Sequence, residues 1–225
     1  MSQPPAGNFT ERLCESLQRP TVNFPTLHVN KNQHVYTFDD PAGSVYFIWS
    51  GQIKLLMISP DGKEGLLTIH TAGDIFGELC LAGSSLRQET ATSMGRVSLT
   101  RIPAAAFLMH LADNSLIEGF VKYLVNRVGE QQQVISHLIT GDSEHRLGEA
   151  LLRLARKLGQ PELQTTRIKQ KITHEELSEM VGTTRPRITA FMRKFRSLGL
   201  IETPRRFLIV KERKLADYLA PSRTA

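Results

Sequence analysis

The hydrophobic periodicity of this 225-residue chain changes at Pro103. Before Pro103, short apolar runs alternate with glycine-rich turns, which is typical of a small β-barrel or sandwich. After Pro103, apolar residues recur at helical spacing. The chain is therefore predicted to have an α+β fold, with a β-rich N-terminal part and an α-rich C-terminal part.

Short strands are predicted along the N-terminal part, at residues 44–50, 52–59, 66–71, 74–76 and 97–102. Residues 60–63 are predicted to form a hairpin turn, because Pro60 restricts one backbone angle and Gly62 tolerates positive φ. A short helix is expected from Ala104 to Leu111.

A long helix is predicted from Asn114 onward. With Gln131 included, its seam residues are spaced alternately by four and three: Ile117, Val121, Leu124, Val128, Gln131, Ile135 and Leu138. This is the a/d spacing of a two-stranded coiled coil, and it predicts a homodimer interface. The spacing also fits an amphipathic helix packed on its own barrel. Gln131 either sets the register of the seam or contacts an effector.

Two further helices joined by a tight turn are predicted near the C-terminus. Thr173 and Glu176 have the spacing of a capping box, which indicates a helix through Met180. Gly182 lies in the turn that follows, and a second helix is expected at 185–198. This is the pattern of a helix-turn-helix. A helix at 143–158, a loop at 159–161 and a two-stranded wing at 199–210 complete the C-terminal part.

Basic residues are concentrated in this C-terminal part. Residues 1–142 contain 10 Lys and Arg against 13 Asp and Glu, net −3, whereas residues 143–225 contain 18 against 9, net +9, together the 28 and 22 of the whole chain. Five basic residues lie on the second helix: Arg185, Arg187, Arg193, Lys194 and Arg196. The distribution indicates contact with a polyanion, although a solvated basic face is the alternative.

Several classes of function are disfavoured by the sequence. Cys14 and Cys80 are too few for an iron-sulfur cluster within one chain. Haem bound through His70 and Cys80 is disfavoured, since isolated residues of these types are usually structural, and a thiol switch at Cys80 stays open. No metal-binding histidine pair and no catalytic fingerprint is present, so an enzyme is not expected. We expect a cytoplasmic protein without a membrane partner.

The assembled pieces resemble the cyclic AMP receptor protein and FNR family of bacterial transcription regulators. The motifs that carry the resemblance are Gly51, the hairpin 61–64, the run 73–79, the long helix and the segment 176–195. The resemblance spans about residues 24–219 and implies three parts. These are an effector-sensing β-roll at 1–112, a dimerisation helix and hinge at 113–142, and a winged helix-turn-helix DNA-binding domain at 143–225.

The resemblance implies an effector pocket formed by Gly77, Glu78, Leu79, Arg87, Gln88, Gln131 and Gln132, with cyclic AMP or cyclic GMP as the candidate effector. Arg87 aligns with the family's phosphate-binding Arg, and a guanidinium suits bidentate phosphate contact. Gln88 and Glu89, however, stand where the family usually has small residues. Glu89 is expected to repel an anionic ligand or to pair with Arg87. Glu78 contacts the ribose or caps the amides of its own loop.

The resemblance also implies which residues contact DNA: Thr173, Thr183, Thr184, Arg185, Arg187, Thr189, Arg193, Arg205 and Arg206. Arg185 matches the position that reads a guanine. Pro186 and Ala190 replace two other base-reading residues, so a different target sequence is expected. Arg187 and Thr189 are the candidate substitutes, and Arg187 fits a phosphate contact equally well.

The sequence thus predicts a homodimeric, sequence-specific transcription regulator that binds a palindromic operator in double-stranded DNA and senses a small molecule. RNA polymerase is an expected partner if the protein is an activator. Two alternatives remain. One is a regulator that binds DNA without a ligand because its pocket is degenerate, and the other is a ligand- or partner-binding module that does not bind DNA.

Overall fold

The computed structural model describes residues 8–58, 64–140, 142–169, 172–204 and 207–220. The chain divides into two compact units, Met1–Glu130 and Gln131–Ala225. The division falls within one helix, α3 (Ile117–Thr140). The predicted domain boundaries stay predictions.

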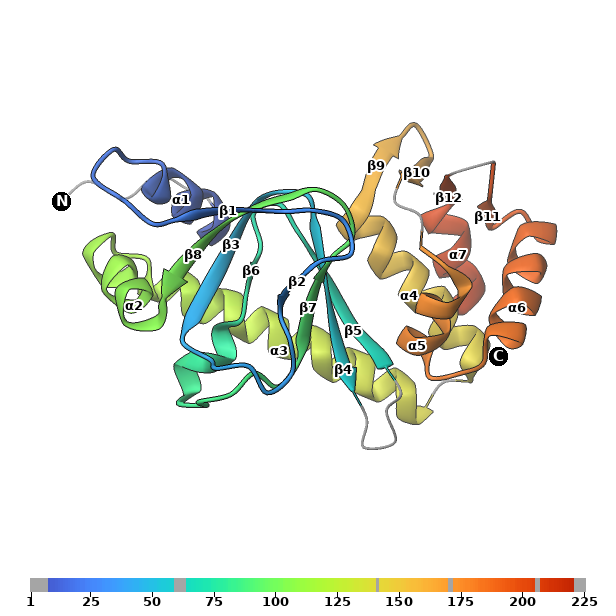
Figure 1. Ribbon diagram of the computed structural model, residues 1–225. Helices are drawn as coiled ribbons and strands as arrows, with labels where there is room; N and C mark the ends of the chain where they lie inside the picture. Colours follow the sequence, from blue (N-terminus) through green and yellow to red (C-terminus); the bar gives the residue numbers. More distant parts are fainter. Residues whose placement is uncertain (1–7, 59–63, 141, 170–171, 205–206, 221–225) are drawn as a thin grey trace. The chain divides into compact units, whose positions relative to one another are not determined.

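The first unit is built on two four-stranded antiparallel sheets, in the orders β1-β8-β3-β6 and β2-β7-β4-β5 (Figure 1). The predicted β-rich fold is confirmed, whereas the predicted turn at 60–63 lies outside the described residues. The strands are β1 (Thr26–Val29), β2 (His34–Tyr36), β3 (Ser44–Ser50), β4 (Gln52–Ile58), β5 (Glu64–Thr71), β6 (Ile75–Phe76), β7 (Thr90–Ser93) and β8 (Val97–Pro103).

The alternation of side chains along β3 divides the apolar core of this unit in two. Tyr46 and Ile48 lie in a cluster with residues from both sheets. Val45 and Phe47 lie in a second cluster. That cluster is formed with helices α1 (Phe9–Leu17), α2 (Ala104–Asp113) and the start of α3.

Helix α1 was not anticipated from the sequence. Asn8 and Glu11 form a capping box at its start. The ring of Phe9 then packs against Phe120 and Tyr123 of α3, with centroid distances of 5.6 and 5.3 Å. Gly119 allows this approach, since a Cβ there would lie 3.3 Å from the Phe9 ring.

The apolar residues of α3 do not all face the same surroundings. Leu124 is half-buried and packs against the core shared with α1 and α2. The neighbouring Val125 is instead 62% exposed. The exposed apolar stripe consists of Ile117, Val121, Val125, Val128 and Ile135. The predicted a/d seam therefore mixed Leu124, which faces the core, with residues of the exposed stripe. The side chain of Leu138, the last seam residue, lies outside the described part of the chain.

The second unit packs helices against one four-stranded antiparallel sheet, β11-β12-β10-β9. Its elements are α4 (Ser143–Leu158), β9 (Gly159–Glu162), β10 (Thr165–Ile168), α5 (His174–Val181), α6 (Arg185–Ser197), β11 (Ile201–Glu202), β12 (Leu208–Val210) and α7 (Glu212–Leu219). The prediction of a loop at 159–161 was wrong, because these residues belong to β9, which pairs with β10. The wing strands β11 and β12 extend the same sheet.

Candidate DNA interface and effector pocket

Helix α5 begins with the predicted capping box. The backbone N–H of Glu176 donates to Thr173 Oγ1 at 3.1 Å, and the Glu176 carboxylate accepts from the Thr173 N–H at 2.9 Å. Gly182 ends the helix at a positive φ of 65°, a conformation that glycine adopts without strain. Thr173 thus has a structural role in addition to its predicted DNA contact.

Helix α6 separates buried apolar residues from exposed basic ones. Ile188, Met192 and Phe195 are buried. Arg185, Arg187 and Arg193 are exposed, as is Thr184, while Thr183 is half-buried. Pro186 lies in the first turn, where its missing N–H breaks no hydrogen bond.

Two basic residues of α6 have protein partners. Lys194 lies 2.7 Å from the carboxylate of Glu144 in α4, and Tyr218 of α7 donates to that carboxylate at 2.5 Å. Hydrogen bonding to Glu144 raises the pKa of Lys194. Arg196 donates to Thr203 Oγ1 at 3.3 Å. Arg205 and Arg206 lie outside the described residues.

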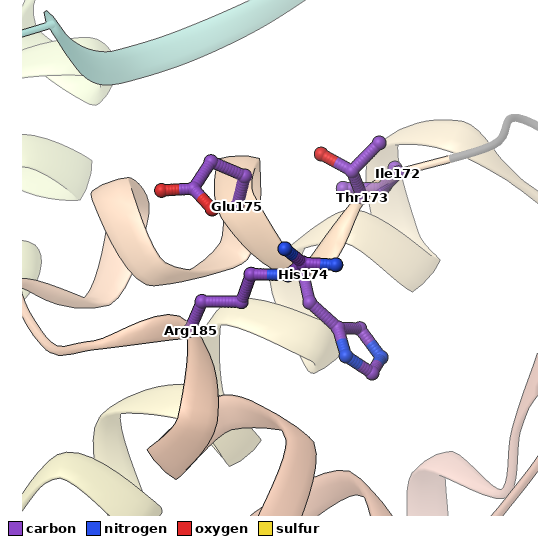
Figure 2. Close-up of a pocket in the computed structure, with 5 residues that line it drawn as sticks. All are labelled: Ile172, Thr173, His174, Glu175 and Arg185. Carbon is purple, nitrogen blue, oxygen red and sulfur yellow. The ribbon is translucent and has the colours of Figure 1, made fainter.

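An open hollow of about 540 Å³ lies where α5 and α6 begin, lined by Ile172, Thr173, His174, Glu175 and Arg185 (Figure 2). Thr189 is half-buried, and its hydroxyl lies 2.9 Å from His174 Nδ1. His174 was not predicted from the sequence, although it directly follows the N-cap residue Thr173.

The structure brings Arg87 and Gly77 together in the β-roll, but Arg87 bonds to the protein itself. Arg87 is only 4% exposed. Its Nη1 donates to the Gly77 carbonyl at 2.9 Å and its Nη2 to the Ser44 carbonyl at 2.7 Å. A Cβ at Gly77 would lie 2.7 Å from Nη1, and the positive φ of 77° would strain any other residue, so the position favours glycine.

Tyr36 covers this guanidinium and links it to Glu89. The Arg87 guanidinium carbon lies 4.1 Å from the centroid of the Tyr36 ring, and the Tyr36 hydroxyl donates to Glu89 Oε1 at 2.7 Å. Burial, followed by the charge of Glu89, raises the pKa of Tyr36. Glu89 is buried and accepts from Tyr36.

Glu78 forms an ion pair with Arg127 of α3, 2.6 Å apart. Burial raises the pKa of Glu78, and the charge of Arg127 opposes this shift. The Arg127 guanidinium also lies over the ring of Tyr123, at 5.7 Å. Arg127 was not predicted as a pocket residue, and its only signal in the sequence is a basic residue beside the apolar seam.

The other predicted effector residues are less closely associated with this cluster. Leu79 and Gln88 are exposed. Gln131 and Gln132 are exposed residues of α3 that belong to the second unit, so their effector contact stays a prediction.

Among the residues that the structure describes, no group of three or more His, Cys, Asp or Glu side chains could hold a metal ion. In the same part of the chain, no helix is long and apolar enough to cross a bilayer. Both cysteines are half-buried, and burial raises the pKa of each thiol. This shift disfavours the reactive thiolate of Cys80.

Comparison with known families places both parts of the chain. Residues 26–114 match the cyclic nucleotide-binding domain, and residues 145–218 match the Crp-like helix-turn-helix domain. The chain belongs to the Crp-Fnr family of transcription regulators. The family match agrees with the resemblance that the sequence motifs indicated.

Curated relatives in this family extend over most of the chain. The CRP-like cAMP-activated global transcriptional regulator of Mycobacterium tuberculosis is 29% identical over 196 residues, covering 87% of this chain and 85% of the relative. The global nitrogen regulator of a Nostoc species is 27% identical over 198 residues, covering 86% and 89%. These relatives are transcription regulators and not enzymes, as the sequence predicted.

Solved structures of family members show the same fold. A mutant of CooA from Carboxydothermus hydrogenoformans superposes with a TM-score of 0.76 at 22% identity, covering 97% of this chain and 98% of that one. The c-di-GMP responsive regulator CLP of Xanthomonas campestris gives 0.71 at 19% identity, covering 90% and 97%. The predicted combination of a β-roll with a helix-turn-helix is thereby confirmed.

Proposed function

We propose that this DNA-binding transcription regulator acts as a homodimer that reads a palindromic operator through α6. The observation that carries the proposal is the exposure of Arg185, Arg187 and Arg193 together on the second helix of the helix-turn-helix. A two-fold dimer presents two such helices about 34 Å apart, matching half-sites one turn of DNA apart. Thr183, Thr184 and the wing residues Arg205 and Arg206 are assigned to the DNA backbone.

Arg185→Ala is expected to weaken binding to the selected operator by about 1 to 3 kcal/mol and to relax the base preference at one position per half-site. The reason is that an exposed guanidinium in the first turn of α6 is suited to the O6 and N7 acceptors of guanine. In vitro selection followed by anisotropy titration measures both effects. Arg156→Ala, which removes an exposed charge from α4, serves as the control and should leave base preference unchanged. An equal loss on operator and on random DNA would identify Arg185 as a phosphate anchor instead.

A small-molecule effector bound in the β-roll is the first candidate for regulation. The match of residues 26–114 to the cyclic nucleotide-binding domain supports it. The related regulators are described as cAMP-activated in one case and c-di-GMP responsive in another. The effector therefore differs between similar proteins. Cyclic AMP or cyclic GMP is a candidate effector for this chain, but the family match does not specify it.

Ligand-independent DNA binding is the second candidate, and the internal bonds of Arg87 favour it. Both terminal nitrogens of Arg87 donate to backbone carbonyls, and Glu78 is paired with Arg127. A cyclic phosphate would have to displace the carbonyls of Gly77 and Ser44 from this guanidinium. It would also come close to the buried carboxylate of Glu89, at a further electrostatic cost.

Calorimetry on the full chain distinguishes the two candidates. Because the Arg87 guanidinium is already bonded within the protein, we expect no tight binding of cyclic AMP or cyclic GMP. The Kd should be weaker than about 1 mM, which corresponds to a binding free energy of about −4 kcal/mol. Operator affinity should then be unchanged by either nucleotide. Micromolar binding by either nucleotide, or a dependence of operator affinity on it, would restore the effector candidate.

A further inference from the structure

The hydroxyl of Thr189 contacts both His174 and the backbone carbonyl of Arg185. A threonine hydroxyl has one proton to donate. Thr189 Oγ1 donates it to the Arg185 carbonyl one helical turn earlier, at 3.0 Å. As long as this bond is kept, Nδ1–H must donate in the 2.9 Å contact between His174 Nδ1 and Thr189 Oγ1, whose direction depends on the tautomer of the ring.

With the bond from Thr189 to the Arg185 carbonyl kept, the neutral imidazole has one compatible tautomer. With the proton held on Nδ1, Nε2 carries a lone pair and acts only as an acceptor. Within the described part of the chain, Nε2 has no hydrogen-bond partner. A neutral His174 therefore offers no donor to a ligand.

The pocket around His174 lies on the face that carries the exposed arginines, and it combines groups that attract an anion with the carboxylate of Glu175. Arg185 lines it from the first turn of α6 (Figure 2). The N-terminus of α5 opens into it as well, where the helix dipole favours negative charge. The anion available at this face in a regulator of this family is a phosphate of the DNA backbone.

A backbone phosphate carries only acceptors, so it cannot bond to the lone pair of a neutral His174. We propose that His174 binds a DNA backbone phosphate in its doubly protonated form, so that DNA binding by this chain takes up a proton at His174. The inference rests on the proposed DNA-binding function and adds a pH dependence to it. Thr189 is the positioning residue, because its hydroxyl keeps the first proton on Nδ1 and leaves Nε2 to receive the second.

The charged groups around the imidazole are compatible with this linkage. Glu175 and Arg185, which carry opposite charges, share the pocket with His174. Glu176 accepts from the backbone and hydroxyl of Thr173. From α4, which packs on α5, Arg146 donates to the carbonyls of Val181 and Gly182 at the far end of α5. These protein charges are present with and without DNA, whereas the negative charge of the phosphate is added beside His174 only in the DNA complex.

Proton uptake on DNA binding sets the direction in which pH changes the affinity for DNA. A complex that binds more protons than the free protein is favoured as the pH falls. Affinity of the full chain for labelled duplexes of random sequence, about 30 base pairs long, should rise about fivefold from about pH 8 to about pH 6 at constant ionic strength. Random sequence is the appropriate probe because a phosphate contact is sequence-independent. Fluorescence anisotropy measures the affinity.

Three variants separate the mechanism from general effects of pH. His174→Gln carries a permanent donor and should bind with no more than about a twofold change over this range. Thr189→Val removes the acceptor for Nδ1–H, so the neutral ring can place its proton on Nε2. This variant should bind more tightly at about pH 8 and show a smaller pH dependence. His28→Gln, on β1 of the first unit, should retain the wild-type slope.

Each outcome distinguishes the linkage from the function on which it rests. Salt-dependent DNA binding with a flat pH profile, or a slope that persists in His174→Gln, would overturn the linkage and leave the DNA-binding function intact. A Thr189→Val variant with the wild-type slope would overturn the role of Thr189. Absence of salt-dependent binding to any duplex would overturn the DNA-binding function and the linkage together.

Discussion

Val125→Glu is expected to convert the protein from a dimer to a monomer at micromolar concentration and to reduce operator affinity at least about 100-fold. Val125 is 62% exposed within the apolar stripe of α3, where a second copy would cover it. A carboxylate buried there without a partner costs several kcal/mol. The loss of affinity follows because two linked recognition helices bind DNA 10² to 10⁴ times more tightly than one, roughly. Sedimentation and anisotropy titration measure the two effects.

Two other substitutions on α3 make this result specific. Asn126→Glu adds the same charge at an exposed position outside the stripe, and it should remain dimeric. Leu124→Glu should lower the free energy of unfolding, because Leu124 packs against the core of its own unit. A dimer that tolerates Val125→Glu and also Val128→Glu would place the interface elsewhere.

Arg87→Met is expected to lower the free energy of unfolding by about 3 kcal/mol. The substitution keeps an unbranched apolar stem but removes the donors to the Gly77 and Ser44 carbonyls and the cation over Tyr36. A buried acceptor left without a donor costs about 1 to 3 kcal/mol, and the buried carboxylate of Glu89 would also lose a nearby positive charge. Urea unfolding followed by circular dichroism measures the change.

The exposed Arg96 provides the matched control for this substitution. Arg96→Met removes the same charge from the first unit and should change stability by less than about 0.5 kcal/mol. If Arg87→Met is equally mild, the guanidinium does not stabilise the β-roll and is free to bind a ligand. That result would favour the effector candidate over ligand-independent DNA binding.

The sequence alone determined those elements whose signals are local. The strand at 44–50 was readable because Gly51 directly follows its apolar run, and β3 has these bounds. The start of α5 was readable from Thr173 and Glu176, since a capping box needs only residues three apart. The Gly182 corner and the exposed arginines of α6 followed from turn chemistry and helical spacing.

Only the tertiary structure decided what the functional side chains contact. Arg87 was readable as a phosphate ligand, but its acceptor at Ser44 lies 43 residues away in the chain. Lys194 was counted with the DNA-facing charges, yet it pairs with Glu144, 50 residues earlier. Sequence spacing carries no information about such partners, because they depend on how distant elements pack.

The apolar seam of α3 shows the same limit within one helix. Leu124 and Val125 are adjacent and both fit a helical apolar stripe, because residues 100° apart around a helix can border one broad face. The packing of α1, α2 and the β-roll places Leu124 against the core and leaves Val125 exposed. Periodicity therefore determined that α3 has an apolar face, and the neighbouring elements determined which part of that face is left exposed.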